Sequence, residues 1–242
     1  MTQSQSAHDL LTSGDGKLSL HYFSIEGVGE QVRIALSIAG IAFEDIRVPF
    51  SEWQTKKPTT KYGQLPEMIL PSGQLITESM AMLRLAGEAD PEGKLYPIAD
   101  VGKRLRIEEV LGLTADLARA WRPAIYIGMR PDLFGYPTGA DWAQDEKNAT
   151  LKNLREAFLA NELPRYMEYF TNLIKEAGGN AFLLGEDLTI ADIAAYQGIT
   201  YFSRGVADYV PVDCLESYPE VLAFLKRVEE HPKVAAYKAS KA

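Results

Sequence analysis

Cysteine is almost absent from this sequence, and so are long apolar runs. Cys214 is the one cysteine among 242 residues, which excludes an internal disulfide bond and a CxxC redox motif and fits a reducing, cytoplasmic setting. No run of about 18 consecutive apolar residues occurs, so we expect no membrane span. Residues 1–17 lack the basic start and the apolar segment of a secretory signal, and we expect them to form a flexible N-terminal extension.

An excess of positive charge is also lacking. The formal net charge is −8 and the isoelectric point is about 5.0, which argues against a nucleic acid partner. A hydrophobic content of 46% and a charged content of 24% are ordinary for a soluble globular protein. The length of 242 residues allows one large domain or two small ones.

Residues 61–79 carry the most informative local pattern. Pro66 suits the entry of a strand, because it has no N–H and a fixed φ. Pro71–Gly73 is typical of a type I turn followed by a residue at positive φ, and residues 74–76 form the return strand of a hairpin. Ser79 begins an apolar helix, where a hydroxyl and free N–H groups make a natural carboxylate pocket. The segment predicts a site for a small, charged, peptide-like ligand; the alternative is a hairpin and a helix with nothing bound.

The residues before this segment predict a β-α-β unit. Residues 17–23 alternate as a strand does, residues 28–39 place their apolar side chains on one helical face, and residues 43–48 form the next strand. This order implies a parallel strand pair joined by a crossover helix.

The chain changes character after residues 91–97, which are rich in proline and glycine and which we interpret as a linker. The strand signal then disappears. Helical periodicity covers residues 100–128 and 147–177, and Pro164 is expected to kink or break the second of these helices. Two more helices are predicted over residues 216–229 and 231–239.

A capping box precedes those last two helices. Thr189 is its N-cap, Asp192 is at N3, and Leu188 and Ile193 are spaced as a hydrophobic staple. The predicted fold class is therefore α/β plus all-α, with an α/β domain over residues 18–94 and an all-helical domain over residues 99–242.

Taken in order, these features resemble the cytosolic glutathione S-transferases, most closely the sigma-like, tyrosine-using branch. The resemblance covers nearly everything after residue 17. It implies a thioredoxin-like N-terminal domain, an α-helical C-terminal domain, a homodimer, a cytoplasmic location and a role in detoxification. The matching pieces are Leu20–Phe23, Glu52-Trp53 with Lys57, Gly63–Pro66, Glu78-Ser79 before a helix, and Leu188–Asp192.

The resemblance implies a catalytic role for Tyr22, at the end of the first strand. A free thiol has a pKa of about 8.5 and is mostly protonated at neutral pH, whereas the thiolate is the strong nucleophile. A hydroxyl that donates a hydrogen bond to sulfur favours the ionised form. The alternative, from the residues alone, is a strand tyrosine whose ring packs and whose hydroxyl contacts water.

The remaining glutathione contacts are also implied by the resemblance. Ser79 binds the γ-glutamyl carboxylate, Glu78 takes the amino end, and the backbone of Leu65, before a cis Pro66, pairs with the cysteinyl unit. Trp53 and Lys57 meet the glycyl carboxylate, and Lys56, Lys57 and Lys61 form a local positive region that suits an anion; the alternative is a solvated loop. The full glutathione-binding set is Tyr22, Trp53, Lys57, Gln64, Leu65, Pro66, Glu78, Ser79 and Glu108, the last offered to the neighbouring subunit.

The chain departs from its relatives just after the tyrosine strand. Relatives often carry Arg-Gly-Arg there, and an arginine supports the thiolate, but this chain has Glu26-Gly27-Val28. Gln64 replaces a frequent lysine. Arg33, one helix turn on, is the candidate substitute for the missing arginines.

A second substrate, a small hydrophobic electrophile, is expected in a pocket between the domains. Its candidate lining residues are Phe23, Trp121, Ile125, Tyr126 and Met129, with Tyr201 and Phe202 as weaker candidates. An aromatic and methionine stripe at helical spacing is more often core than pocket wall. Cys214 is assigned no role.

Three functions remain open from the sequence. The first is a glutathione transferase that adds glutathione, its co-substrate, to electrophiles without a metal. The second is a glutathione-binding protein of low turnover, which the missing arginines permit. The third is a glutathione-dependent isomerase or peroxidase on the same site.

Overall fold

The computed structural model describes residues 5–179 and 181–241, except for the side chain of Ala140. By their internal contacts these residues form two compact units, each described separately below. Unit 1 contains the chain up to Ile107, Asp187–Ile193 and the C-terminal stretch from Val228, and unit 2 contains Glu108–Glu186 and Ala194–Arg227. The expected division near residues 94–99 stays a prediction.

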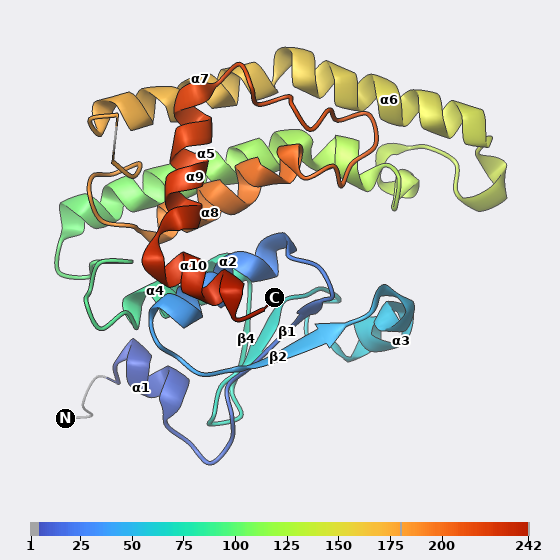
Figure 1. Ribbon diagram of the computed structural model, residues 1–242. Coiled ribbons are helices and arrows are strands. Elements are labelled where there is room, and N and C mark those ends of the chain that lie inside the picture. The colour runs from blue at the N-terminus through green and yellow to red at the C-terminus, as the bar shows by residue number, and fades with distance from the viewer. Residues whose placement is uncertain (1–4, 180, 242) are drawn as a thin grey trace. The chain divides into compact units, whose positions relative to one another are not determined.

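Unit 1 is built on a four-stranded sheet (Figure 1), whose strands lie in the order β2-β1-β3-β4. Strands β1 (Ser19–Phe23) and β2 (Glu44–Val48) are parallel, which confirms the predicted β-α-β unit. Strand β3 (Glu67–Ile69) is antiparallel to β1 and to β4 (Leu75–Thr77). This is the thioredoxin-like arrangement that the sequence predicts.

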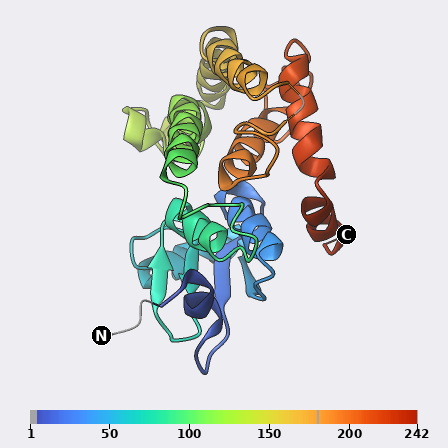
Figure 2. The ribbon, with the colours of Figure 1, turned by 90° about the vertical axis from the view of Figure 1, so that its left-hand side faces the viewer.

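Two helices, α2 (Gly27–Ile38) and α4 (Ser79–Glu88), pack against each other along the sheet (Figure 2). Because side chains alternate along a strand, Leu20 and Tyr22 point to one face of β1 and His21 and Phe23 to the other. The Phe23 ring stacks on Phe50 and meets Trp53 edge-on. These aromatic contacts connect β1 to the short helices η1 (Phe50–Glu52) and α3 (Trp53–Lys56), and η2 (Lys57–Thr59) follows α3 directly.

The hairpin turn has the predicted geometry. The Gly73 N–H donates to the Leu70 carbonyl at 2.8 Å, and the Leu70 N–H donates to the Gln74 carbonyl at 2.9 Å. Gly73 has φ = +84°, a conformation that a side chain would strain. The turn therefore fixes the spacing between Pro66 and the start of α4.

The described residues before β1, where a flexible extension is expected, include a helix. Helix α1 (Ala7–Thr12) is capped by the Ser6 hydroxyl, and it buries Ala7 and Leu11 and contacts α4. The Gly16 N–H donates to the Pro71 carbonyl at 3.0 Å, which ties the segment to the hairpin. Burial of the two apolar side chains outweighs the cost of ordering this short helix. Residues 1–4 of the expected extension lie outside the described residues.

The rest of the described chain is helical, as predicted, and Pro164 ends one helix and begins the next. It lies in the first turn of α7, where its missing N–H leaves no helical bond unmade. The elements are α5 (Val101–Tyr126), η3 (Pro131–Phe134), η4 (Gly139–Asp141), α6 (Gln144–Asn161), α7 (Leu163–Glu176), α8 (Ile190–Thr200), η5 (Tyr201–Ser203), α9 (Pro219–Glu230) and α10 (Pro232–Ala239).

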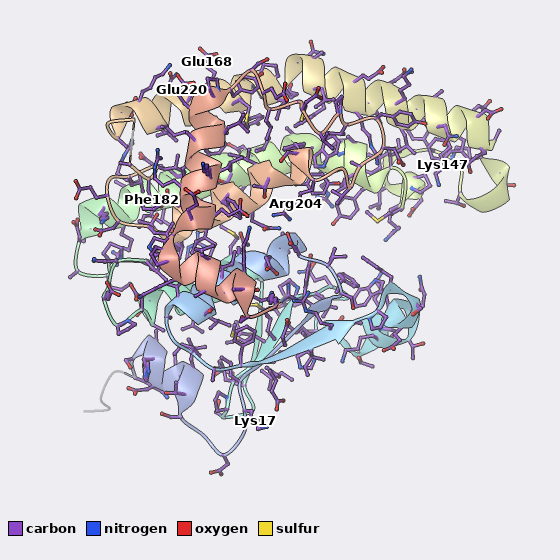
Figure 3. The ribbon with its side chains drawn as sticks, in the orientation of Figure 1. Lys17, Lys147, Glu168, Phe182, Arg204 and Glu220 are labelled. Carbon is purple, nitrogen blue, oxygen red and sulfur yellow. The ribbon has the colours of Figure 1, made fainter. Side chains whose placement is uncertain are left out.

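Polar side chains close the ends of helix α8. At its start the backbone N–H and hydroxyl of Thr189 both donate to the buried Asp192 carboxylate, at 2.8 and 2.7 Å, which confirms the predicted capping box. Near its C-terminal end Arg204, labelled in Figure 3, donates to the Thr200 hydroxyl at 2.7 Å. No helix in the described ranges is long and apolar enough to cross a membrane.

The docked N-terminal helix generates a stability prediction. Replacing Leu11, which is 1% exposed, by alanine leaves a cavity and should lower the free energy of unfolding by about 2–5 kcal/mol. Urea denaturation followed by tryptophan fluorescence measures the change. The control is His8→Ala on the exposed side of the same helix, expected to stay within about 0.5 kcal/mol. Equal effects from both variants would mean that α1 does not dock in solution.

Candidate active site

Tyr22 lies at the end of β1 beneath the first turn of α2. Its side chain is 7% exposed, and its hydroxyl accepts a hydrogen bond from the Val28 N–H at 3.3 Å. Two glycines allow this close approach: a Cβ on Gly27 would lie 2.4 Å from the Tyr22 hydroxyl, and a Cβ on Gly29 would lie 2.5 Å from the ring. The helix can therefore rest on the phenol only because both positions lack a side chain.

Arg33, one helical turn after Gly29 in α2, also lies over the Tyr22 ring. Its guanidinium carbon is 5.6 Å from the Tyr22 ring centroid, and the residue is 0% exposed. Its Nη1 donates to the carbonyls of Ile25 and Glu26 at 3.3 and 3.4 Å. Its Nη2 has no hydrogen-bond partner among the described residues, so the ring face is the favourable contact that we identify on this side. One side chain thus joins the loop before α2 to the tyrosine.

Two carboxylates neutralise this buried cation. Glu30, one helical turn before Arg33, accepts from Nη1 at 3.1 Å, and Asp45 of β2 accepts from Nε at 2.9 Å. The second Asp45 oxygen accepts from Arg47 at 2.7 Å, and Arg47 also donates to the Ile25 carbonyl at 3.2 Å. A buried guanidinium needs such partners, because an unpaired charge away from water is strongly unfavourable.

The segment predicted to hold a peptide-like ligand is also preformed. The Leu65–Pro66 peptide bond is cis, as the resemblance predicts. The antiparallel register pairs His21 with Glu67, so continuing it by one residue places Tyr22 beside Pro66. Leu65 precedes the first paired residue of β3, and its backbone therefore lies outside the β1–β3 ladder.

Glu78 and Ser79 form a polar corner at the start of α4. Glu78 has φ = +71°, which is uncommon for a residue with a side chain and is typical of ligand-binding positions. The Gln64 amide donates to the Glu78 carboxylate at 2.9 Å, which joins the loop before Pro66 to the helix start. Ser79 is the first residue of the helix, where amide groups precede the first intrahelical bond.

The lysine region follows the same loop. The Lys57 side chain passes 3.4 Å from a Cβ built on Gly63, next to Gln64. The Lys61 N–H donates to the buried Glu67 carboxylate at 2.7 Å, which fixes the end of the loop. Trp53 is half-buried against Phe23. Of the predicted set, Tyr22, Trp53, Lys57, Gln64, Leu65, Pro66, Glu78 and Ser79 all belong to unit 1.

Phe23, predicted for the electrophile pocket, also belongs to unit 1, whereas Glu108 and the other pocket candidates belong to unit 2. Trp121 is 5% exposed and packs on Phe158 and Phe202 at ring distances of 4.8 and 5.3 Å, as a core residue does. The other described side chains range from buried to exposed: Phe202 is buried, Ile125, Tyr201 and Glu108 are half-buried, and Tyr126 and Met129 are exposed. A role for any of them in a pocket or across a subunit interface stays a prediction.

Two titratable side chains outside the predicted catalytic set are mainly neutral at pH 7. Burial, with the nearby Asp213, raises the pKa of the Cys214 thiol. Burial, with the charge of Lys56, lowers the pKa of His21. No group of three or more His, Cys, Asp or Glu side chains in the described ranges is arranged to hold a metal ion.

Sequence reasoning missed several residues around Tyr22. The contacts on Tyr22 depend on the absence of side chains at Gly27 and Gly29 and on the backbone N–H of Val28. Amino-acid composition does not reveal such contacts. The sequence did contain one signal of the buried ion pair, which is the i, i+3 spacing of Glu30 and Arg33 in a largely apolar helix. Charged side chains on a buried helix face are normally paired with each other.

Two domains of a known protein family match this chain. The N-terminal domain of glutathione S-transferases matches residues 18–85, and the C-terminal domain of glutathione S-transferases matches residues 138–241. The chain belongs to the glutathione S-transferase family. The two matches cover both the sheet unit that holds Tyr22 and most of the helical residues.

Individual relatives agree with this assignment. A glutathione S-transferase of Anopheles gambiae is 28% identical over 92% of this chain and 95% of its own length. S-crystallin 4 of Enteroctopus dofleini is 27% identical over 90% of this chain and 94% of its own length. The solved structure of prostaglandin synthase D of Nilaparvata lugens has a TM-score of 0.73 and 26% identity, covering 93% of this chain and 98% of that chain. The fold predicted for this glutathione S-transferase is confirmed.

The glycine contacts yield a prediction about the site. Gly29→Ala should shift the Tyr22 ring and reduce glutathione conjugation about tenfold or more, because a 1 Å displacement of a positioned group is costly. Conjugation of a chromogenic electrophile measures the loss. Gly112→Ala is the control, since a Cβ there meets nothing within 4 Å and alanine favours the helix. If both variants conjugated at the wild-type rate, the close packing on Tyr22 would be irrelevant to activity.

Proposed function

We propose that this glutathione transferase activates the glutathione thiol through the Tyr22 hydroxyl. The observation that carries the proposal is the environment of that hydroxyl. It accepts from the Val28 N–H at 3.3 Å, and a phenol hydroxyl that accepts one hydrogen bond can also donate one to sulfur. The positively charged Arg33 guanidinium lies over the ring, where it stabilises negative charge that develops on the phenol as the hydroxyl donates. A backbone N–H and Arg33 together take the part of the missing arginines.

The tripeptide occupies the segment between the lysine loop and α4 in this proposal. Ser79 binds the γ-glutamyl carboxylate, because its hydroxyl and the first amide groups of α4 favour an anion. Glu78, held by Gln64, takes the amino end. The Leu65 backbone pairs with the cysteinyl unit, and Trp53 and Lys57 meet the glycyl carboxylate. Each ligand charge then faces a group of opposite charge or a donor.

The reaction is a thiolate addition. The thiol proton leaves to water as glutathione binds, and the Tyr22 hydroxyl donates to the resulting sulfur anion. A sulfur lone pair forms the new carbon–sulfur bond, and a leaving group departs with its bonding electrons. If the electrophile has no leaving group, the adjacent carbanion takes a proton from water.

The second substrate and the biological setting belong to the same proposal. The electrophile is a small hydrophobic molecule, with Phe23, Trp121, Ile125, Tyr126 and Met129 as candidate contacts. The protein acts as a cytoplasmic homodimer in detoxification, and Glu108 serves the neighbouring subunit's glutathione.

Replacing Tyr22 by phenylalanine tests the catalytic role. The variant should lose about 10- to 100-fold in kcat/KM at pH 7, since a hydrogen bond to a charged group is worth about 1.5–3 kcal/mol. Removing the donor destabilises the thiolate, so the pKa of the bound thiol should rise towards about 8.5. The pH dependence of conjugation, or thiolate absorbance of the complex, reports that pKa.

The same measurements show whether the proposed role of Tyr22 is wrong. Unchanged turnover and an unchanged pH profile in the Tyr22→Phe enzyme would remove Tyr22 from the mechanism. Wild-type retention on immobilised glutathione, with no conjugation of any electrophile tested, would instead favour a glutathione-binding protein.

The carboxylate site at the start of α4 is tested by glutathione affinity. Ser79→Ala should weaken binding about tenfold, because it removes a hydrogen bond to a charged group. Calorimetric titration measures the dissociation constant. The control is Ser72→Ala at the exposed hairpin tip, for which affinity should not change. An unaltered dissociation constant for the Ser79 variant would place the γ-glutamyl carboxylate elsewhere.

A further inference from the structure

We propose that the C-terminal segment, Tyr237 to Lys241, is a positioning element for Tyr22. It acts through Glu30 and Arg33 and touches neither glutathione nor the electrophile. The inference rests on the proposed function of Tyr22 and assigns a role in catalysis to residues more than 200 positions away in the sequence.

The first link joins the end of the chain to helix α2. Helix α10 packs against α2, and the two lie side by side in Figure 1. The Tyr237 hydroxyl donates to Glu30 Oε1 at 2.9 Å. Lys241 Nζ lies 3.1 and 3.3 Å from the two Glu30 oxygens and 4.1 Å from the Tyr237 ring centroid. Both groups are therefore directed at one carboxylate.

The second link joins that carboxylate to the phenol. Glu30 is 7% exposed and accepts from Arg33 Nη1 through Oε2. The same Arg33 nitrogen donates to the carbonyls of Ile25 and Glu26, which set the path of the loop that ends in the Val28 N–H. The guanidinium also covers the Tyr22 ring. The orientation of Arg33 thus determines two of the contacts made by Tyr22.

The C-terminal segment controls how the two carboxylate oxygens of Glu30 are shared among its hydrogen-bond donors. With Tyr237 and Lys241 in place, Glu30 Oε1 accepts from both of them, and Oε2 is shared between Lys241 and Arg33. If they are removed, Oε1 is left buried with an unmet need for a donor. Arg33 Nη2, which lacks a hydrogen-bond partner within the described part of the chain, is the donor that the inference assigns to it. A bidentate pair with Glu30 would then turn the guanidinium away from the Tyr22 ring.

The opposite side of Arg33 resists this rotation less. Its contact there is Asp45, which is shared with Arg47, and Arg47 is about one-third exposed. Because Asp45 already has a second cation, it holds Arg33 less firmly than an unshared carboxylate would. The occupation of Glu30 by the C-terminal segment is therefore the control on where the guanidinium lies.

The test compares three single variants of the full chain. Tyr237→Phe and Lys241→Ala each remove one donor to Glu30, whereas Lys238→Ala removes an equal charge from the same end of the chain, one paired with Glu229. The first two should lower kcat/KM about 3- to 10-fold and raise the pKa of the bound thiol, as Tyr22→Phe does but to a smaller extent. The control should match wild type. Lys241→Arg should restore the wild-type pH profile.

The outcomes separate this inference from the proposed function. If Tyr22→Phe impairs conjugation but Tyr237→Phe and Lys241→Ala match wild type, the positioning role is wrong and the function stands. A loss of activity with a lower melting temperature and an unshifted pH profile would show a merely structural segment and overturn the inference, as would an equal effect of Lys238→Ala. If Tyr22→Phe itself has no effect, both proposals fail together.

Discussion

The buried guanidinium of Arg33 is the constraint on which the site depends. It is fully enclosed, so every favourable contact it makes replaces one with water. Those contacts come from a loop before α2, from Glu30 on its own helix and from Asp45 on β2. Because the guanidinium bonds to all three at once, it fixes the loop, the helix and the strand relative to one another. The ring of Tyr22 packs against this guanidinium.

The scaffold explains why a thioredoxin-like unit without a nearby cysteine can still perform thiol chemistry. The nucleophile arrives with the substrate, so the protein has to supply a donor to sulfur and contacts for a charged peptide. In the proposed site much of that is backbone: the Val28 N–H that contacts Tyr22, the segment before Pro66 and the first amides of α4. Backbone groups do not depend on side-chain identity, which gives a physical reason why a family with relatives at 26–28% identity keeps one fold.

Both ends of the described chain return to unit 1. Near the N-terminus, α1 buries Leu11 and the following loop bonds to Pro71 at the hairpin tip. At the other end, α10 lies on α2, and Lys233 pairs with Glu92 at 2.7 Å. Unit 1 is thus held together in part by segments that are distant in sequence. One of them, the C-terminal segment, contacts Glu30, which is paired with Arg33 next to Tyr22.

The sequence by itself determined the features that arise from local chemistry. Four features follow from the conformational preferences of neighbouring residues and appear as predicted. They are the strand in residues 17–23, the Pro71–Gly73 turn, the Thr189 capping box and the helix break at Pro164. Motif order supplied the family and, through it, the proposed glutathione contacts. Only the tertiary structure decided that Ala7 and Leu11 dock instead of fraying, because their partners lie on a helix far along the chain. Only it brought Tyr237 and Lys241 to Glu30, because pairing over 207 and 211 positions has no periodicity or spacing that a sequence pattern can reveal.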